Sequence, residues 1–424
     1  MKKYLIIVLI SGFSISVFSK STQVIVLGAQ VQNTNKQEYL LNSNNLIDAA
    51  RSKGEHVFIG APSEYEKEFN HHENVTFVTV ETQKELSAMF KRVNFENAES
   101  INLYIHAHGL PTTSEKRPDE VKILLGRVRL GLDHLTKMLN YRINKGQKLK
   151  VIAPFCFSGA VHQISYSRPN TCSASASDFR TPSISEFDCF AGKCVIEDSW
   201  ATRFTEAVKS NKNSTLAAGF QIAQGDGELN DKRGSLSSID FLKRLYSKAP
   251  YNKTRNWFTR VFSSVPEITP KQDAMRKYCK SKESIFSVTT DDVESLLDEL
   301  SDKVHNMSDN YGFESNIPKS IQIHYHDKLF EYSLTFEKRK ELFLGFFELG
   351  RKAKKLMDMG HGDEYQGQLS MASLYSEKLR LSSNDLLEFL KINDEIELIN
   401  KLYKSKNLKN IKKFEELFYC ENSN

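Results

Sequence analysis

Two short motifs carry residue types that could perform nucleophilic catalysis. In the first, residues 101–105, apolar except for Asn102, lead into His-Ala-His108-Gly109. In the second, residues 149–153, apolar except for Lys150, lead into Pro-Phe-Cys156-Phe-Ser-Gly159. A cysteine attacks a carbonyl carbon as its thiolate, and a histidine can take the thiol proton and later pass it to a leaving amine. The motifs therefore predict Cys156 as a nucleophile and His108 as its catalytic base.

Strands and helices alternate around these motifs. Continuous apolar runs predict buried strands, and helical spacing predicts helices between them. The expected strands are Val24–Leu27, His56–Ile59, Val75–Val80, Ile101–Ile105 and Leu149–Ala153, and the expected helices are Asn42–Ser52, Glu81–Val93 and Leu132–Tyr141. This order predicts an α/β fold, a mainly parallel sheet flanked by helices. In parallel sheets, functional residues lie at the carboxyl ends of the strands. This arrangement would bring His108 and Cys156 together.

The motif order resembles the caspase–legumain superfamily of cysteine peptidases. In this superfamily a strand is followed by His-Gly and, about 50 residues later, another strand is followed by the cysteine. In this chain Cys156 follows His108 by 48 positions. The resemblance covers Gln23–Tyr246 and is closest to legumain-like bacterial members. It implies the caspase–hemoglobinase fold and an oxyanion hole made by the backbone N–H groups of Gly109 and Cys156.

The resemblance also suggests where substrate would bind. The segment Thr171–Asp178 resembles the strand whose end lines the primary specificity pocket, so Ser173, Ser175 and Asp178 are the expected pocket residues. An acid in this region, Asp178, Glu186 or Asp188, could select Arg or Lys, although solvated loop charge is the alternative. Legumain carries an acid where this chain has Ala107, and many relatives carry one at the position of Pro154, so asparagine specificity is unsupported.

Other histidines have simpler interpretations. His106 lies on the same side of its strand as His108 but does not precede the glycine, which makes it the weaker catalytic candidate. We interpret His162, after Cys156, as structural. Two further pairs, His71 with His72 and His324 with His326, are expected in exposed polar loops, with weak metal binding as the less favoured alternative. No metal and no cofactor is expected, because a Cys–His peptidase needs neither.

These residues predict an exported cysteine endopeptidase that works through an acyl-enzyme on a peptide or protein substrate. Two alternatives remain: a transamidase using the same Cys–His dyad, or a catalytically silent binding scaffold. Nucleic acid is not an expected partner, because the net charge of +5 is small and the basic residues are spread along the chain.

The chain divides into four expected parts. A basic start and the apolar run Tyr4–Phe18 predict a signal peptide over residues 1–19, too short to span a bilayer; this indicates a secreted or periplasmic protein without a transmembrane anchor. The peptidase domain is expected over 22–249, a linker over 250–270, and a mostly α-helical C-terminal domain over 271–424. By analogy with legumain, that domain could be an autoinhibitory cap, separated by cleavage near Lys253, Arg255 or Arg260.

Finer expectations concern the C-terminal region and the cysteines. Helices are expected at Asp291–His305, Glu337–Asp358, Gly367–Leu379, Asn384–Asn393 and the Lys-rich end, and a short hairpin at Ile321–His326 with Phe330–Leu334. Export permits disulfides among the six cysteines. The expected pairs are Cys279 with Cys420 and two among Cys172, Cys189 and Cys194, with Cys156 left as a thiol.

Overall fold

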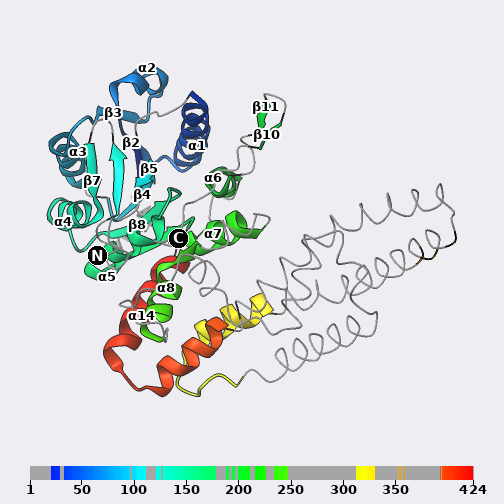
Figure 1. Cartoon of the computed structure of the whole chain (residues 1–424). Helices are drawn as coiled ribbons and strands as arrows, with labels where there is room; N and C mark the ends of the chain where they lie inside the picture. The colour runs from blue at the N-terminus through cyan, green and yellow to red at the C-terminus, as the bar shows by residue number, and fades with distance from the viewer. Residues whose placement is uncertain are drawn as a thin grey trace, which may run out of the picture.

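A seven-stranded sheet forms the centre of the computed structural model (Figure 1). The structure describes residues 21–28, 33–95, 98–110, 121–125, 128–177, 188–190, 193–195, 199–210, 215–225, 234–246, 312–329, 352, 355, 359, 392 and 394–423. The strand order is β12-β9-β8-β4-β1-β2-β3. The bounds are β1 Ser21–Leu27, β2 His56–Ala61, β3 Val75–Thr79, β4 Ser100–His106, β8 Lys148–Ala153, β9 Thr171–Ser175 and β12 Ser235–Leu236.

All neighbouring strands of this sheet run parallel except β12, which pairs antiparallel with β9 at the edge. The predicted α/β fold with a mainly parallel sheet is thereby confirmed. Two small antiparallel units accompany it. One contains β5 His108–Leu110, β6 Lys122–Leu125 and β7 Val128–Gly131, and the other pairs β10 Asp188–Phe190 with β11 Lys193–Val195.

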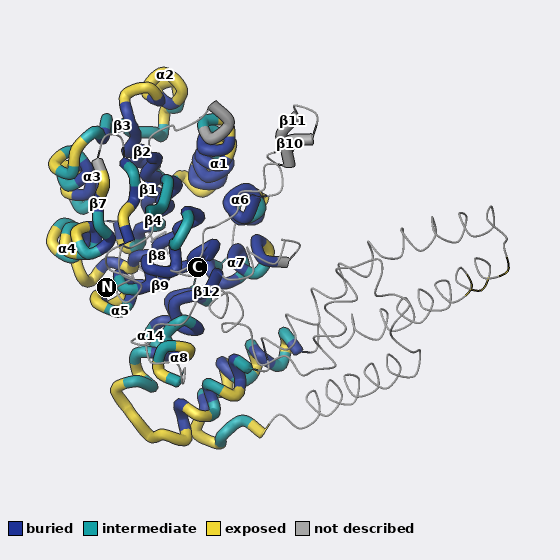
Figure 2. The backbone as a smooth tube through the Cα atoms, viewed as in Figure 1, coloured by how far each residue is buried: buried dark blue, intermediate teal, exposed yellow. Residues whose placement is uncertain are grey.

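Helices cover both faces of the large sheet. One apolar cluster joins it to α3 Gln83–Phe95, α4 Leu132–Arg142 and α5 His162–Ser167. A second joins the opposite face to α1 Asn33–Ser52, α6 Trp200–Ser210, α7 Leu216–Gly225 and α14 Leu408–Asn422. A short 3-10 helix, η1 Ser63–Tyr65, and α2 Glu66–Phe69 link β2 to β3. Most of these strands are buried between the layers, whereas the edge strand β3 is only partly buried (Figure 2). Burial on both faces explains the continuous apolar run at residues 24–27 of β1.

The hairpin predicted at Ile321–His326 is wrong, because residues 319–329 are helical. Alternating apolar residues suggested a strand, yet Ile323 is 58% exposed. The side chains that are buried lie four residues apart, at Ile321, Tyr325 and Leu329. That spacing places them on one helical face, and they pack with α8 Ser237–Tyr246 and α14 in a third apolar cluster.

Of the other expected C-terminal helices, the Lys-rich end forms α14. Asp291–His305 and Gly367–Leu379 lie outside the described residues, as does nearly all of Glu337–Asp358 and Asn384–Asn393. Among the described helices, none is both long and apolar enough to cross a membrane.

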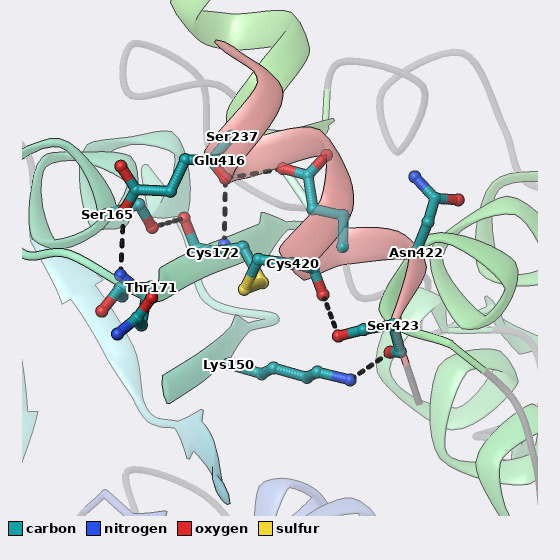
Figure 3. Close-up of a disulfide and its surroundings, with 12 residues drawn as sticks. Lys150, Ser165, Thr171, Cys172, Ser237, Glu416, Cys420, Asn422 and Ser423 are labelled. Carbon is teal, nitrogen blue, oxygen red and sulfur yellow. Dashed lines mark hydrogen bonds between the residues drawn. A yellow bond between two sulfur atoms is a disulfide. The ribbon is translucent and has the colours of Figure 1, made fainter. Parts of the chain in front are cut away.

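Helix α14 is joined covalently to the sheet. Cys420 forms a disulfide with Cys172 of β9 (Figure 3), so the predicted Cys279–Cys420 pair is wrong. Cys172 lies on the sheet face that α14 covers, where its side chain is fully buried, and this places the two sulfurs together. Because Cys172 bonds to Cys420, a second disulfide within the predicted group of three could only join Cys189 to Cys194. These two cysteines are register partners across β10 and β11.

Polar contacts surround the disulfide (Figure 3). The Lys150 ammonium donates to the Ser423 carbonyl at 2.5 Å, and the Asn170 N–H donates to the Glu416 carboxylate at 2.8 Å. The carboxylate of Glu421 is fully buried and accepts from the Ser237 hydroxyl at 2.6 Å and the Ser238 N–H at 2.8 Å. It thereby satisfies an orphan donor at the start of α8. The last helix is bound to β8, β9 and α8.

We expect Cys172→Ser and Cys420→Ser each to lower the free energy of unfolding by about 2–5 kcal/mol, because the cross-link restricts the unfolded chain. Urea unfolding of the oxidised proteins measures this. Cys279→Ser is the matched comparison and should cost less stability than Cys172→Ser, because Cys420 is bonded to Cys172 and not to Cys279. A large loss with Cys279→Ser and none with Cys172→Ser would contradict the observed pairing.

Candidate active site

The two motifs lie on neighbouring strands. β4 and β8 pair in parallel, with Leu103 opposite Val151 and Tyr104 opposite Ile152. Both strands therefore end at the same edge of the sheet. β4 ends at His106 and the chain continues through Ala107 into β5, which begins at His108. The predicted proximity of the two strand ends is thus confirmed.

Gly109 lies directly against the backbone of Cys156. A Cβ atom at position 109 would stand 1.8 Å from the Cys156 carbonyl oxygen and 2.8 Å from its carbonyl carbon. No side chain other than hydrogen fits in that space. The His-Gly motif and the cysteine motif are therefore in van der Waals contact through their backbones.

The turn that presents Cys156 is conformationally unusual. Phe157, the next residue, has φ 63° in the left-handed region, which costs a non-glycine residue roughly 1–2 kcal/mol. Hydrogen bonds hold the turn in place. The Ser177 hydroxyl accepts from the Ser158 N–H at 3.1 Å and donates to the Phe155 carbonyl at 3.3 Å. Strained backbone held by its surroundings is characteristic of functional sites.

The helix that follows the Cys156 turn is short. It begins as a 3-10 helix, η3 Ser158–Val161, and continues as α5, which has only 6 residues. The Ser158 N–H is already used by Ser177 and by the Phe155 carbonyl at 3.2 Å. A helix dipole would therefore give a thiolate at Cys156 little support.

His108 and Cys156 have suitable environments for their expected roles. Both side chains are partly buried, and Cys156 keeps its thiol. Burial lowers the pKa of His108 below its usual value, because desolvation disfavours the imidazolium. His108 is thus a neutral imidazole at neutral pH, able to accept a proton.

His106 occupies a different environment. It is buried, and desolvation together with the nearby His108 lowers its pKa to about 3. Its Nε2 lies 3.8 Å from Glu38 Oε1, and its Nδ1 lies 3.4 Å from the Tyr104 hydroxyl. The ring of Tyr39 is 4.2 Å from that of His106 and 6.4 Å from that of His108. Sequence reasoning missed Glu38 and Tyr39, because nothing in the spacing of α1 signals their contact with the histidines.

The expected pocket residues are placed unequally. Ser173 and Ser175 are fully buried on β9, and both hydroxyls contact His162: Ser173 Oγ lies 2.8 Å from Nδ1 and Ser175 Oγ lies 3.1 Å from Nε2. They belong to an internal network, which also includes the Ser235 hydroxyl 3.1 Å from Nε2. Their role in substrate binding stays a prediction. Asp178 lies outside the described residues.

His162 has the structural position that the sequence suggested. It is fully buried, and burial lowers its pKa to about 4.

The remaining histidines show no metal cluster: no group of three or more metal-ligating side chains occurs among the described residues. His72 instead contacts Arg51 at 2.8 Å, and the ring of His324 lies 5.2 Å from that of Phe418. Both His324 and His326 lie in the helix at 319–329 and not in a loop.

We expect Gly109→Ala to destabilise the protein by about 1–3 kcal/mol, because the added methyl group forces the Cys156 turn away from β5. Urea unfolding measures the change. The control is Gly146→Ala, whose Cβ would meet nothing closer than Asn144 Oδ1 at 3.5 Å. Equal stabilities of the two variants would show that the strand ends are not in close contact.

Lowering the pH should reduce the free energy of unfolding, because the buried His162 resists protonation in the folded protein. Its pKa is about 4 in the folded protein and near 6.5 when unfolded, so the unfolded chain binds the extra proton first. Stability from this group is therefore complete above pH 6.5 and falls as the pH drops toward 4, by about 3 kcal/mol. His162→Gln should flatten this part of the curve of unfolding free energy against pH. An unchanged slope would contradict the burial of a neutral imidazole.

Comparison with known proteins adds no relative to this picture. No protein-family model and no curated protein matches the chain. The interpretation of the site consequently depends on the residues themselves, on the parallel pairing of β4 with β8, and on the contact between Gly109 and Cys156.

Proposed function

We propose that this chain is a cysteine endopeptidase in which Cys156 is the nucleophile and His108 is the general base and acid. The observation that carries the proposal is the close approach of Gly109 to the Cys156 carbonyl. It joins two motifs that are distant in sequence, and both contain a residue type that peptide hydrolysis needs.

The reaction follows from the two environments. A neutral His108 takes the proton from the Cys156 thiol, and the thiolate attacks the peptide carbonyl carbon. The carbonyl oxygen becomes an oxyanion, for which the N–H groups of Gly109 and Cys156 are the proposed donors. His108 returns the proton to the leaving amine, and an acyl-enzyme remains. Water then attacks the thioester with His108 as base, which releases the acid and restores the thiol.

The sheet supports a fold of the caspase–hemoglobinase type. The histidine and the cysteine follow adjacent parallel strands of one sheet with helices on both faces. These are the positions that the resemblance assigns to the dyad. The proposed substrate class, a peptide or protein, follows from the same resemblance.

The proposed location is outside the cytoplasm. The disulfide between Cys172 and Cys420 supports it, because such bonds persist mainly in oxidising compartments. The expected signal peptide at residues 1–19 lies outside the described residues. An autoinhibitory role for the C-terminal domain remains part of this proposal.

Labelling with peptide acyloxymethyl ketones tests the proposal. We expect the wild-type protein to be labelled at Cys156, and Cys156→Ala and His108→Ala to lose at least about 99% of the labelling rate, since each removes one half of the dyad. Probes ending in Arg, Lys, Asn or Asp would identify the preferred residue. Mass spectrometry locates the modified cysteine, and circular dichroism checks that the variants fold.

Two outcomes would redirect the proposal. Absence of labelling in folded wild-type protein, both in the intact chain and after cleavage near Lys253 that leaves the Cys172–Cys420 disulfide in place, would favour a binding scaffold. Labelling of Cys156 together with transfer of the acyl group to an added amine, in preference to water, would identify a transamidase.

A further inference from the structure

A buried group of titratable side chains lies beside His108 and takes no part in the reaction described above. It contains Glu38 and Tyr39 of α1, and Tyr104 and His106 of β4. All four are at most 4% exposed. Burial of so many polar groups is costly unless they interact with one another or with a function. Their position next to the proposed base calls for an explanation.

The carboxylate of Glu38 is held in a defined place. Its Oε1 accepts a hydrogen bond from the Ser199 hydroxyl at 2.8 Å, and Ser199 also accepts from the Thr202 N–H at 3.1 Å in the first turn of α6. Glu38 therefore connects α6 to the histidines. Burial raises the pKa of the Glu38 carboxyl overall, and the Ser199 hydrogen bond offsets part of that rise by stabilising the ionised form.

His106 separates Glu38 from His108. At 3.8 Å its Nε2 is too far from Glu38 Oε1 for a hydrogen bond, and it stays neutral because its pKa is about 3. The Tyr104 hydroxyl approaches its other nitrogen, and the Tyr39 ring lies against it. The imidazole is thus held on three sides, and Tyr39 extends the packing to His108.

We propose that Glu38, acting through His106, is a positioning residue that stabilises the protonated state of His108. This inference rests on the proposed function. When the Cys156 S–H bond breaks and the proton moves to His108, a positive charge forms in a partly buried place. A nearby negative charge offsets that cost, and the neutral His106 fixes the geometry between the two.

No other buried acid in the described part of the chain can do this. The remaining buried carboxylates are Glu395 and Glu421. Glu421 accepts from Ser237 and Ser238, and Glu395 accepts from the Tyr325 hydroxyl at 3.2 Å. Both belong to the packing of the C-terminal helices. Glu38 is the one that lies beside the histidine pair.

The test is the pH dependence of Cys156 alkylation by iodoacetamide, followed by mass spectrometry of the peptide that contains Cys156. Glu38→Gln keeps the shape of the side chain and removes its charge. We expect its rate to fall about tenfold at pH 6, which corresponds to one pKa unit. Above pH 9 the rates should converge, because the thiol then loses its proton to solvent. Glu38→Asp, which keeps the charge, should restore part of the alkylation rate at pH 6.

Glu421→Gln is the matched control, because it removes the charge of a buried acid in α14 and leaves Glu38 in place. Its alkylation rate at pH 6 should equal that of the wild type. Should Glu38→Gln fail to fold, Ser199→Ala replaces it. Loss of that hydroxyl makes Glu38 harder to ionise, so the acid limb should shift in the same direction by a smaller amount. A purely structural role would lower the rate equally at every pH, and that result overturns the inference.

The inference and the proposed function fail differently. A wild-type acid limb that depends on His108 but is unmoved by Glu38→Gln overturns the role of Glu38 and leaves the dyad intact. A wild-type profile identical to that of His108→Ala shows that Cys156 does not exchange its proton with His108, and both proposals then fall.

Discussion

The parallel pairing of β4 with β8 is the constraint on which the candidate site depends. It sets two strand ends side by side and leaves so little room that only a glycine fits between β5 and the Cys156 turn. The backbones that carry His108 and Cys156 are thus placed side by side by the sheet itself. Because the sheet is buried on both faces, that geometry is as rigid as the core itself.

Much of the fold could be read from the sequence because a buried parallel sheet leaves a strong signal. The run at 24–27 is apolar without interruption, the run at 149–153 is interrupted only by Lys150, and both became central strands. Helix boundaries were harder. The helix predicted from Asn42 begins at Asn33, since the polar residues at its start provide no apolar period.

The site was predictable only where its chemistry is local. The motifs around His108 and Cys156 each lie within a few residues, whereas Glu38 reaches His106 through tertiary packing alone. Ser173 and Ser175 were assigned by resemblance, and their contacts with His162 depend on a fold-wide network. The Cys172–Cys420 pair escaped prediction for a related reason: cysteine spacing says nothing about which helix covers a strand.

The disulfide closes residues 172 to 420 into a covalent loop. A single cut in the backbone inside that loop, for instance near Lys253, opens it without dividing the molecule. The chain would become two polypeptides held by one bond, with α14 still packed on β9. If cutting activates this protein, the gain must come from rearrangement of segments that stay attached, and not from the departure of the last helix.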